Sequence, residues 1–396
     1  MAQKILLVTT LKWPSAPRLA GAFASLGCRV EGVFPSGHML QVSRYLSRGH
    51  PYRPLRPLSS IAAAITAANP DLVVPCDDRA VRHLLTLHAT APSPEFSVLL
   101  AHSLGNLDSY PILMARSRAI AAAQAEGIVA PLTLPVVKEA ELSSALVTIG
   151  FPAVLKADES WGGDSVVIVH TQEEACRALR KLTGPPSRLR SVARSVLRKD
   201  AHFLHAAWAP KAVTVHVQRF IFGKPATSAF ACRDGAVLAA LHVDVIDWRG
   251  ATGPARLIKR VQCSEMDEAA RRIARRFALN GLHGLDFVRD ESGVAHLIEV
   301  NPRATQICHL VLGTGNDMVA ALAGERPRPV TTDLAAVALF PQAWDHDLKA
   351  TQFSGVYEDV PWDDPAVLRV IAEDRFMVEP AIRTAAARLR PQNARS

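Results

Sequence analysis

The sequence predicts an α/β protein of two or three domains, because 396 residues exceed what one small core usually organises. A buried-strand run at residues 4–10, a helical pattern at 18–26 and a second strand at 28–33 follow one another near the N-terminus. Strand, helix and strand at this spacing are typical of a right-handed parallel unit. Later strand pairs are joined by tight turns instead, at residues 226–245 and 284–303, which indicates an α+β part after the parallel one.

The composition is that of a globular protein with anionic ligands. Hydrophobic residues make up 49% and charged residues 21% of the chain. The net charge of +8 favours nucleotides and carboxylates, and no recognition motif predicts a specific nucleic-acid partner. The six cysteines form no CxxC pair, so we expect neither zinc nor a disulfide framework, and a cytoplasmic location. We expect no membrane association, since no run approaches the roughly 20 apolar residues of a membrane span.

The most informative stretch is residues 284–303, which we predict to form two strands around a tight turn. Residues 290–293 supply the turn, and alternating apolar residues lie on either side. We expect Arg289 to face Val294 across the turn. This register matters, because a shift of one residue would move the side chains of one strand to the opposite face.

Three oxygen-bearing side chains gather on one sheet face in that register. Asp286 faces Leu297, and Glu299 is its diagonal neighbour at about 7–8 Å. Asn301 lies two residues beyond Glu299 and shares its face. Two carboxylates and an amide oxygen suit Mg²⁺, which is usually held by one or two carboxylates plus substrate phosphates. We therefore predict that Asp286, Glu299 and Asn301 bind the metal.

Arg303 places a cation beside these predicted ligands. Carboxylates, Mg²⁺ and an arginine at one spot are typical of a phosphoryl-transfer site. The alternative is a solvated hairpin with acids on its outer face. The apolar neighbours of Glu299 favour the metal site, since buried acids are rare unless they are paired.

The segment Glu299-Val-Asn-Pro-Arg303, with Asp286 upstream, resembles the metal-binding signature of the ATP-grasp superfamily. Members use ATP and Mg²⁺ (or Mn²⁺) to phosphorylate a carboxylate, and an amine usually displaces phosphate from the acyl phosphate. The resemblance implies a Rossmann-like pre-ATP-grasp domain, a bipartite ATP-grasp domain with a mobile lid, and a C-terminal extension. The expected bounds are 1–110, 111–325 with the lid at about 150–215, and 326–396.

A second block, residues 150–169, contains an apolar strand that ends in Lys156 and a loop with two glycines. Such a lysine is unfavourable unless it meets an anion, and the loop can turn backbone N–H groups toward phosphate oxygens. The block resembles the ATP-grasp lid, where Lys156 would contact the α- and β-phosphates and Gly162, Gly163 and Ser165 would cover the nucleotide. Read alone, the glycines form only a hairpin turn.

Two further segments resemble nucleotide contacts of the family. A basic residue before the turn at residues 127–133 contacts ATP phosphate in members, and counting back places Arg116 there instead of the usual lysine. An arginine solvated on a helix face is the alternative. At the segment that pairs with adenine, Gln218 replaces an acid that often takes the ribose, while Phe220 and Ile221 would bind adenine through their backbone.

Two other polar segments keep both a structural and a functional interpretation. Asp77 and Asp78 follow a strand end, where ligands gather in parallel sheets, but we favour one of them as a helix cap. The basic stretch 187–199 is interpreted as a solvated helical insertion, with an electrostatic collar for an anionic substrate as the alternative. The first loop lacks the G-x-G-x-x-G pattern, so bound NAD is not expected.

The resemblance implies an ATP-dependent carboxylate–amine ligase for small metabolites, with Arg303 and Lys156 as the catalytic cations. Arg303 would stabilise the acyl phosphate, and Lys156 would neutralise the phosphate tail. A thiol ligase, a kinase-like phosphotransferase and a non-catalytic nucleotide-binding regulator stay open. The glutamate–histidine pair of biotin carboxylase lacks its glutamate in residues 305–309, which argues against carboxylation. A homodimer is left open.

Overall fold

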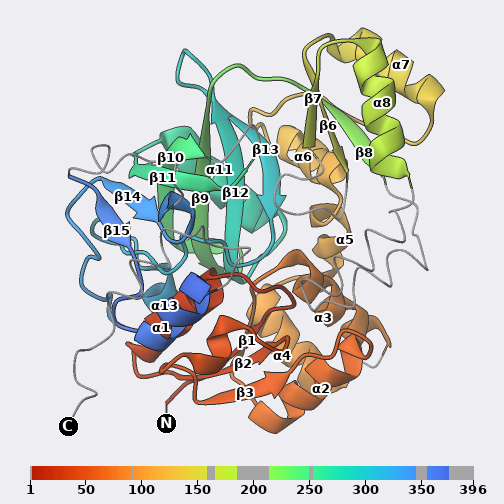
Figure 1. The fold of residues 1–396 in the computed structure, drawn as a ribbon. Helices are drawn as coiled ribbons and strands as arrows, with labels where there is room; N and C mark the ends of the chain where they lie inside the picture. Colours follow the sequence, from red (N-terminus) through yellow and green to blue (C-terminus); the bar gives the residue numbers. More distant parts are fainter. Residues whose placement is uncertain are drawn as a thin grey trace.

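The computed structural model describes residues 2–90, 93–157, 166–184, 214–248, 253–344 and 355–373. Figure 1 shows a parallel sheet with its helices at one end of the molecule and a large, mainly antiparallel sheet beside it. A smaller antiparallel sheet with two helices lies at the opposite end from the parallel sheet. The predicted α/β class and the parallel N-terminal unit are confirmed.

The N-terminal sheet has the order β3-β2-β1-β4, and all its strands are parallel. Its strands are β1 (Lys4–Val8), β2 (Arg29–Phe34), β3 (Arg48–Pro51) and β4 (Leu72–Pro75). The accompanying helices are α1 (Ser15–Ala24), α2 (Pro57–Ala68), α3 (Asp78–Thr90) and α4 (Pro94–Leu104), with the short helix η1 (Met39–Val42). The order reverses between β1 and β4, and ligands bind outside the carboxyl ends of strands at such a point.

The seven-stranded sheet has the order β13-β12-β9-β10-β11-β14-β15. Its strands are β9 (Lys224–Arg233), β10 (Ala236–Trp248), β11 (Ala255–Arg260), β12 (Gly281–Arg289), β13 (Ala295–Asn301), β14 (Ala336–Leu339) and β15 (Tyr357–Asp359). The helices that follow this part of the chain are α11 (Ser264–Arg276), α12 (Met318–Ala323), η3 (Gln342–Trp344) and α13 (Pro365–Glu373). Within it β14 and β15 are parallel, and the other pairs are antiparallel.

Strand β9 shows why the large sheet is covered on both faces. Phe230 and Cys232 pack into a cluster that also contains Leu6 and Val8 of the N-terminal sheet. Ala231, between them in sequence, packs into the second cluster, which includes α1 and α12. Successive strand residues point to opposite faces, so this buried alternation predicts helices on both sides. The shared core fixes the N-terminal sheet against the large sheet.

The small sheet, in the order β5-β8-β6-β7, is antiparallel throughout and has its own apolar cluster. Its elements are β5 (Thr133–Val136), α7 (Glu139–Ile149), β6 (Ala153–Ala157), β7 (Val166–Val169), α8 (Gln172–Thr183) and β8 (Val215–Arg219). Before it come η2 (Leu107–Ser109), α5 (Tyr110–Leu113) and α6 (Arg116–Ala125). The predicted loop residues Gly162, Gly163 and Ser165, and the basic stretch 187–199, lie outside the described residues.

The C-terminal part of the described chain binds to the N-terminal domain. Helix α13 packs against Met39 of η1, and Arg18 of α1 forms an ion pair with Asp359 at the end of β15. The Tyr45 hydroxyl also donates to Asp363 over 2.7 Å. These contacts hold the C-terminal edge of the large sheet against the N-terminal domain. No helix among the described residues is long and apolar enough to cross a membrane.

Candidate active site

Strands β12 and β13 pair in a register that differs from the predicted one. Arg289 faces Ala295 instead of Val294, because the turn is one residue longer. The Asp290 N–H donates to the Val294 carbonyl over 3.0 Å, and the Asp290 carboxylate accepts from the N–H of Val294 at 3.0 Å. The turn therefore includes Val294, which the alternation pattern alone had assigned to the strand.

A β-bulge then brings the two acids opposite each other. Phe287 pairs with Leu297 but Asp286 pairs with Glu299, so Ile298 is the extra residue. The predicted diagonal relationship was therefore wrong, and the acids are direct cross-strand neighbours. Bulges often re-aim side chains beside active sites. Both carboxylates lie on one face of the sheet, as expected. The bulge that places them there was not predicted from the sequence.

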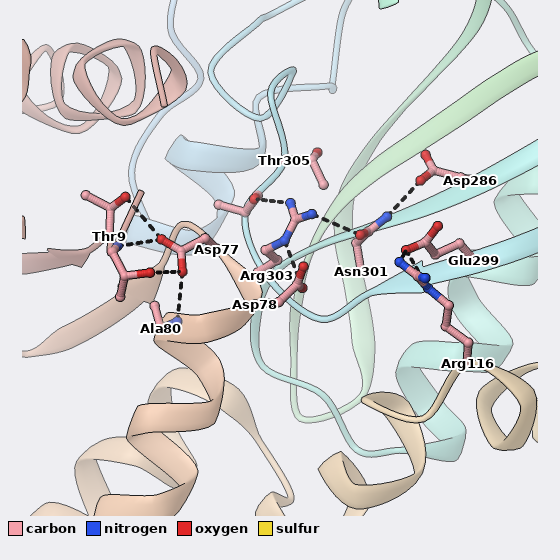
Figure 2. A network of polar contacts seen from close by, with 12 residues as sticks. Thr9, Asp77, Asp78, Ala80, Arg116, Asp286, Glu299, Asn301, Arg303 and Thr305 are labelled. Atoms are coloured by element: carbon pink, nitrogen blue, oxygen red, sulfur yellow. Dashed lines mark hydrogen bonds and ion pairs between the residues drawn. The ribbon is translucent and has the colours of Figure 1, made fainter. Parts of the chain in front are cut away.

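Asn301 completes this cluster with its amide. Its Nδ2 donates to Asp286 Oδ2 over 2.9 Å (Figure 2). Thr227 Oγ1 also donates to the Asp286 carboxylate. Burial and the neighbouring charge of Glu299 raise the pKa of Asp286, while these two hydrogen bonds and Arg303 oppose the rise. Two partly buried carboxylates side by side favour positive charge at this edge of the sheet.

Arg116 supplies part of that positive charge. It begins α6, and its Nη2 and Nε lie 2.8 and 3.1 Å from Glu299 Oε1. Its Nη1 donates to the Ala157 carbonyl at the end of β6 over 2.5 Å. Its side chain is 16% exposed. The alternative of an arginine solvated on a helix face is therefore wrong, and Arg116 links the small sheet to the carboxylate cluster.

Lys156 approaches the same cluster from β6. Its side chain is buried, and Nζ lies 3.5 Å from the Ile298 carbonyl. Burial lowers the pKa of Lys156 to about 8, while the negative charge of Glu299 opposes that shift and Arg116 adds to it. An ammonium desolvated next to carboxylates is suited to receive further negative charge, such as phosphate oxygens.

Arg303 follows β13 and connects the cluster to the N-terminal domain. Its Nη2 donates to Asn301 Oδ1 over 3.1 Å, and its Nε donates to Asp78 Oδ1 over 2.9 Å. Figure 2 shows the guanidinium of Arg303 between these two side chains. The predicted catalytic arginine is thus oriented from both domains.

The two acids after β4 have separate roles. Asp77 caps α3, since its Oδ1 accepts from the Ala80 N–H over 2.8 Å, and it also holds the Thr10 N–H at 2.6 Å (Figure 2). The prediction that one of the pair caps the helix is confirmed. Asp78, at the start of α3, was missed as a partner of Arg303. The feature of the sequence that could have indicated this role is the position of Asp78 beyond the carboxyl end of a strand.

The expected adenine segment begins with Gln218 inside β8 and continues past the end of the strand. The Gln218 side chain is buried, and its Nε2 donates to Thr133 Oγ1 of β5 over 2.9 Å. Gln218 therefore supports strand pairing in this structure. Phe220 and Ile221 come directly after the strand and make no backbone hydrogen bond to another described residue. Their contact with adenine stays a prediction.

The donor set of Asp286, Glu299 and Asn301 fits Mg²⁺ in its chemistry. It offers hard oxygen ligands, and the crowded carboxylates would be relieved by a cation. The described residues include no cluster of three His, Cys, Asp or Glu side chains suited to a metal, and the predicted set has only two carboxylates. Here the Asn301 amide presents Nδ2 to Asp286 and Oδ1 to Arg303, so ligation beside Asp286 would require the amide to turn over.

A comparison with models of protein families gives one match to this part of the chain. Residues 124–306, which include most of this site, match the model of the ATP-grasp domain. This part of the chain is similar to an ATP-grasp domain. A comparison with curated protein sequences finds no match.

Solved structures share the fold of this chain at low sequence identity. N5-carboxyaminoimidazole synthetase from Staphylococcus aureus, complexed with ADP, has a TM-score of 0.60 at 10% identity, over 83% of this chain and 79% of that one. L-amino acid ligase from Bacillus licheniformis has a TM-score of 0.58 at 15% identity, over 82% and 75%. The biotin carboxylase domain of Hydrogenobacter thermophilus 2-oxoglutarate carboxylase, with MgADP and bicarbonate, gives 0.54 at 15% identity, over 83% and 71%.

Proposed function

We propose that this protein is an ATP-dependent ligase that joins a small carboxylic acid to an amine through an acyl phosphate. The observation that carries the proposal is the convergence of Asp286, Glu299 and Asn301 with three cations, Arg116, Lys156 and Arg303. Phosphoryl transfer asks a protein mainly for positioning and charge neutralisation. This cluster beside β12 and β13 would provide both.

Each side chain has a role in the proposed reaction. Asp286, Glu299 and Asn301 would hold Mg²⁺, which when bound supplies positive charge to the β- and γ-phosphates. Lys156 and Arg116 bind the phosphate tail, and Arg303 stabilises the charge on the transferred phosphoryl group. Arg116 is hydrogen-bonded to Glu299 in this structure. When nucleotide and metal bind, they must therefore either share these two side chains or replace the contact between them.

The proposed chemistry has two steps. A carboxylate oxygen of the substrate attacks the γ-phosphorus, and ADP leaves. The amine then attacks the acyl carbon of the acyl phosphate, and inorganic phosphate leaves. Exclusion of water protects the intermediate from hydrolysis. The small sheet, which carries Lys156 and its own core, is the part that would close over the nucleotide.

The substrates in this proposal are a small carboxylate and an amine. Amino acids are the first candidates, because one structure of the same fold is an L-amino acid ligase. The other structures named above are a synthetase and a carboxylase domain, so fold alone does not choose among substrates.

Hydroxamate trapping tests the proposal. Purified protein is incubated with ATP, Mg²⁺, hydroxylamine and a panel of amino acids and other small carboxylates, and ADP and hydroxamate are measured. The ligase forms hydroxamate only with its carboxylate, and the amine substrate replaces hydroxylamine. A thiol ligase also gives hydroxamate but accepts a thiol and not an amine. Phosphorylation of an alcohol gives ADP without hydroxamate, and absence of any turnover would indicate a regulator; either result contradicts the ligase.

A further inference from the structure

A cavity of about 780 Å³ opens on the N-terminal domain. Its lining residues include the carboxyl ends of β2 and β3 and the segment that leads into α2. Figure 1 shows β3 at the edge of the parallel sheet beside α2. Its volume falls in the range of small-molecule sites, roughly 300–1,000 Å³. None of the residues that line it belongs to the cluster around Arg303.

The cavity has an apolar floor with a fixed shape. Phe34 ends β2 and is buried, and its ring lies against Gly49 of β3. A Cβ at position 49 would come within 2.6 Å of Phe34 Cζ, so this glycine lets the ring occupy its place. Tyr52 is also buried, and its hydroxyl is hydrogen-bonded to His83 Nε2 at 3.1 Å. Two aromatic residues whose rings are held in place, Phe34 and Tyr52, therefore line the cavity, and such a lining suits a flat or apolar ligand.

The rim of the cavity carries uncompensated positive charge. Arg53 and Arg56 both line it, both are exposed, and neither forms an ion pair with another residue that the structure describes. The Glu31 carboxylate accepts a hydrogen bond from His50 at 2.8 Å and forms an ion pair with Arg29 at 3.0 Å. These two partners offset the negative charge of Glu31. Helix α2 begins directly after Arg56 without a side-chain cap, which adds the positive end of the helix to the same field.

We propose that this cavity binds a small organic anion that has a ring or a similarly apolar body. Its carboxylate or phosphate lies between Arg53 and Arg56, and its body packs on Phe34 and Tyr52. Arginine is well suited to both anionic groups because its planar fork donates two parallel hydrogen bonds. The proposal is independent of the ATP reaction and stands on the cavity alone.

Binding of four simple probes to the full-length protein tests this site. Isothermal titration calorimetry is run with phenyl phosphate, phenylacetate, inorganic phosphate and benzyl alcohol, with and without saturating MgADP. We expect a ring-bearing anion to bind with a Kd below about 1 mM, and both inorganic phosphate and benzyl alcohol to bind more weakly. A preference for phenyl phosphate identifies phosphate esters as the ligand class, and a preference for phenylacetate identifies carboxylates.

Arginine variants locate the binding. Arg53→Ala and Arg56→Ala should each weaken the ring-bearing anion at least about tenfold, because each removes a charge-assisted hydrogen bond. Arg48→Ala, an exposed arginine on β3 that does not line the cavity, is the matched control and should bind normally. The proposal is overturned if neither ring-bearing anion binds, if both cavity variants bind as the native protein does, or if MgADP abolishes binding.

Discussion

Arg303 and Asp78 form an ion pair that joins the ATP-grasp domain to the N-terminal domain, with Nε and Oδ1 2.9 Å apart (Figure 2). Their side chains are 23% and 19% exposed, so the pair is largely withdrawn from water. The same guanidinium holds the Asn301 amide. The N-terminal domain thus orients the arginine proposed to stabilise the transferred phosphoryl group.

Asp78→Asn should lower kcat by about 10- to 100-fold and leave the KM for ATP nearly unchanged, because Arg303 loses its charged anchor while the nucleotide contacts stay. Steady-state kinetics with the substrate pair found by trapping measure this. Asp77→Ala is the neighbouring comparison: it should lower the thermal midpoint through loss of the α3 cap, a cost of about 1 kcal/mol. A kcat for Asp78→Asn within threefold of the native value would contradict a positioning role.

Glu299→Gln should abolish turnover, with a loss of at least about 100-fold, because a neutral amide is a poorer ligand for Mg²⁺ than a carboxylate. Metal titration of the residual activity should show a raised Mg²⁺ requirement. Glu291→Gln makes the same chemical change at an exposed position in the turn of the same hairpin, and it should behave as the native protein. Activity of Glu299→Gln within tenfold of native would refute the metal assignment.

Lys156→Ala should raise the apparent KM for ATP sharply, at least about tenfold, because a buried ammonium that faces the phosphate tail is lost. Equilibrium binding of a fluorescent ATP analogue measures the effect without turnover. Lys224→Ala removes an exposed lysine at the start of β9 and serves as the control. Unchanged nucleotide affinity in Lys156→Ala would show that this lysine does not contact ATP.

Arg116→Lys should retain activity within about tenfold, since a lysine keeps the charge beside Glu299 but forms one contact instead of the paired Nε and Nη2 contacts. Arg116→Ala should lose more, because Glu299 is then left without its partner and the Ala157 carbonyl without its donor. Nucleotide affinity and thermal midpoint are compared for the two variants. Equal behaviour of both would indicate that the charge at this position is unimportant.

The sequence alone determined the features set by local backbone geometry. Glu299 and Asn301 share a face because they lie two residues apart on one strand, and the spacing of residues 4–33 specified the parallel unit. That one of Asp77 and Asp78 caps a helix also followed from their place after a strand. These inferences needed only the period of a strand and the chemistry of a helix end.

The tertiary structure decided which distant side chains meet. The partnership of Asp286 and Glu299 depends on a longer turn and a bulge at Ile298, which the alternation of apolar residues does not encode. Arg116 reaches Glu299, and Asp78 reaches Arg303, only because the apolar faces of β9 and its covering elements pack the domains together. Contacts between separate elements depend on how whole faces pack, and residue spacing along the chain carries no such information.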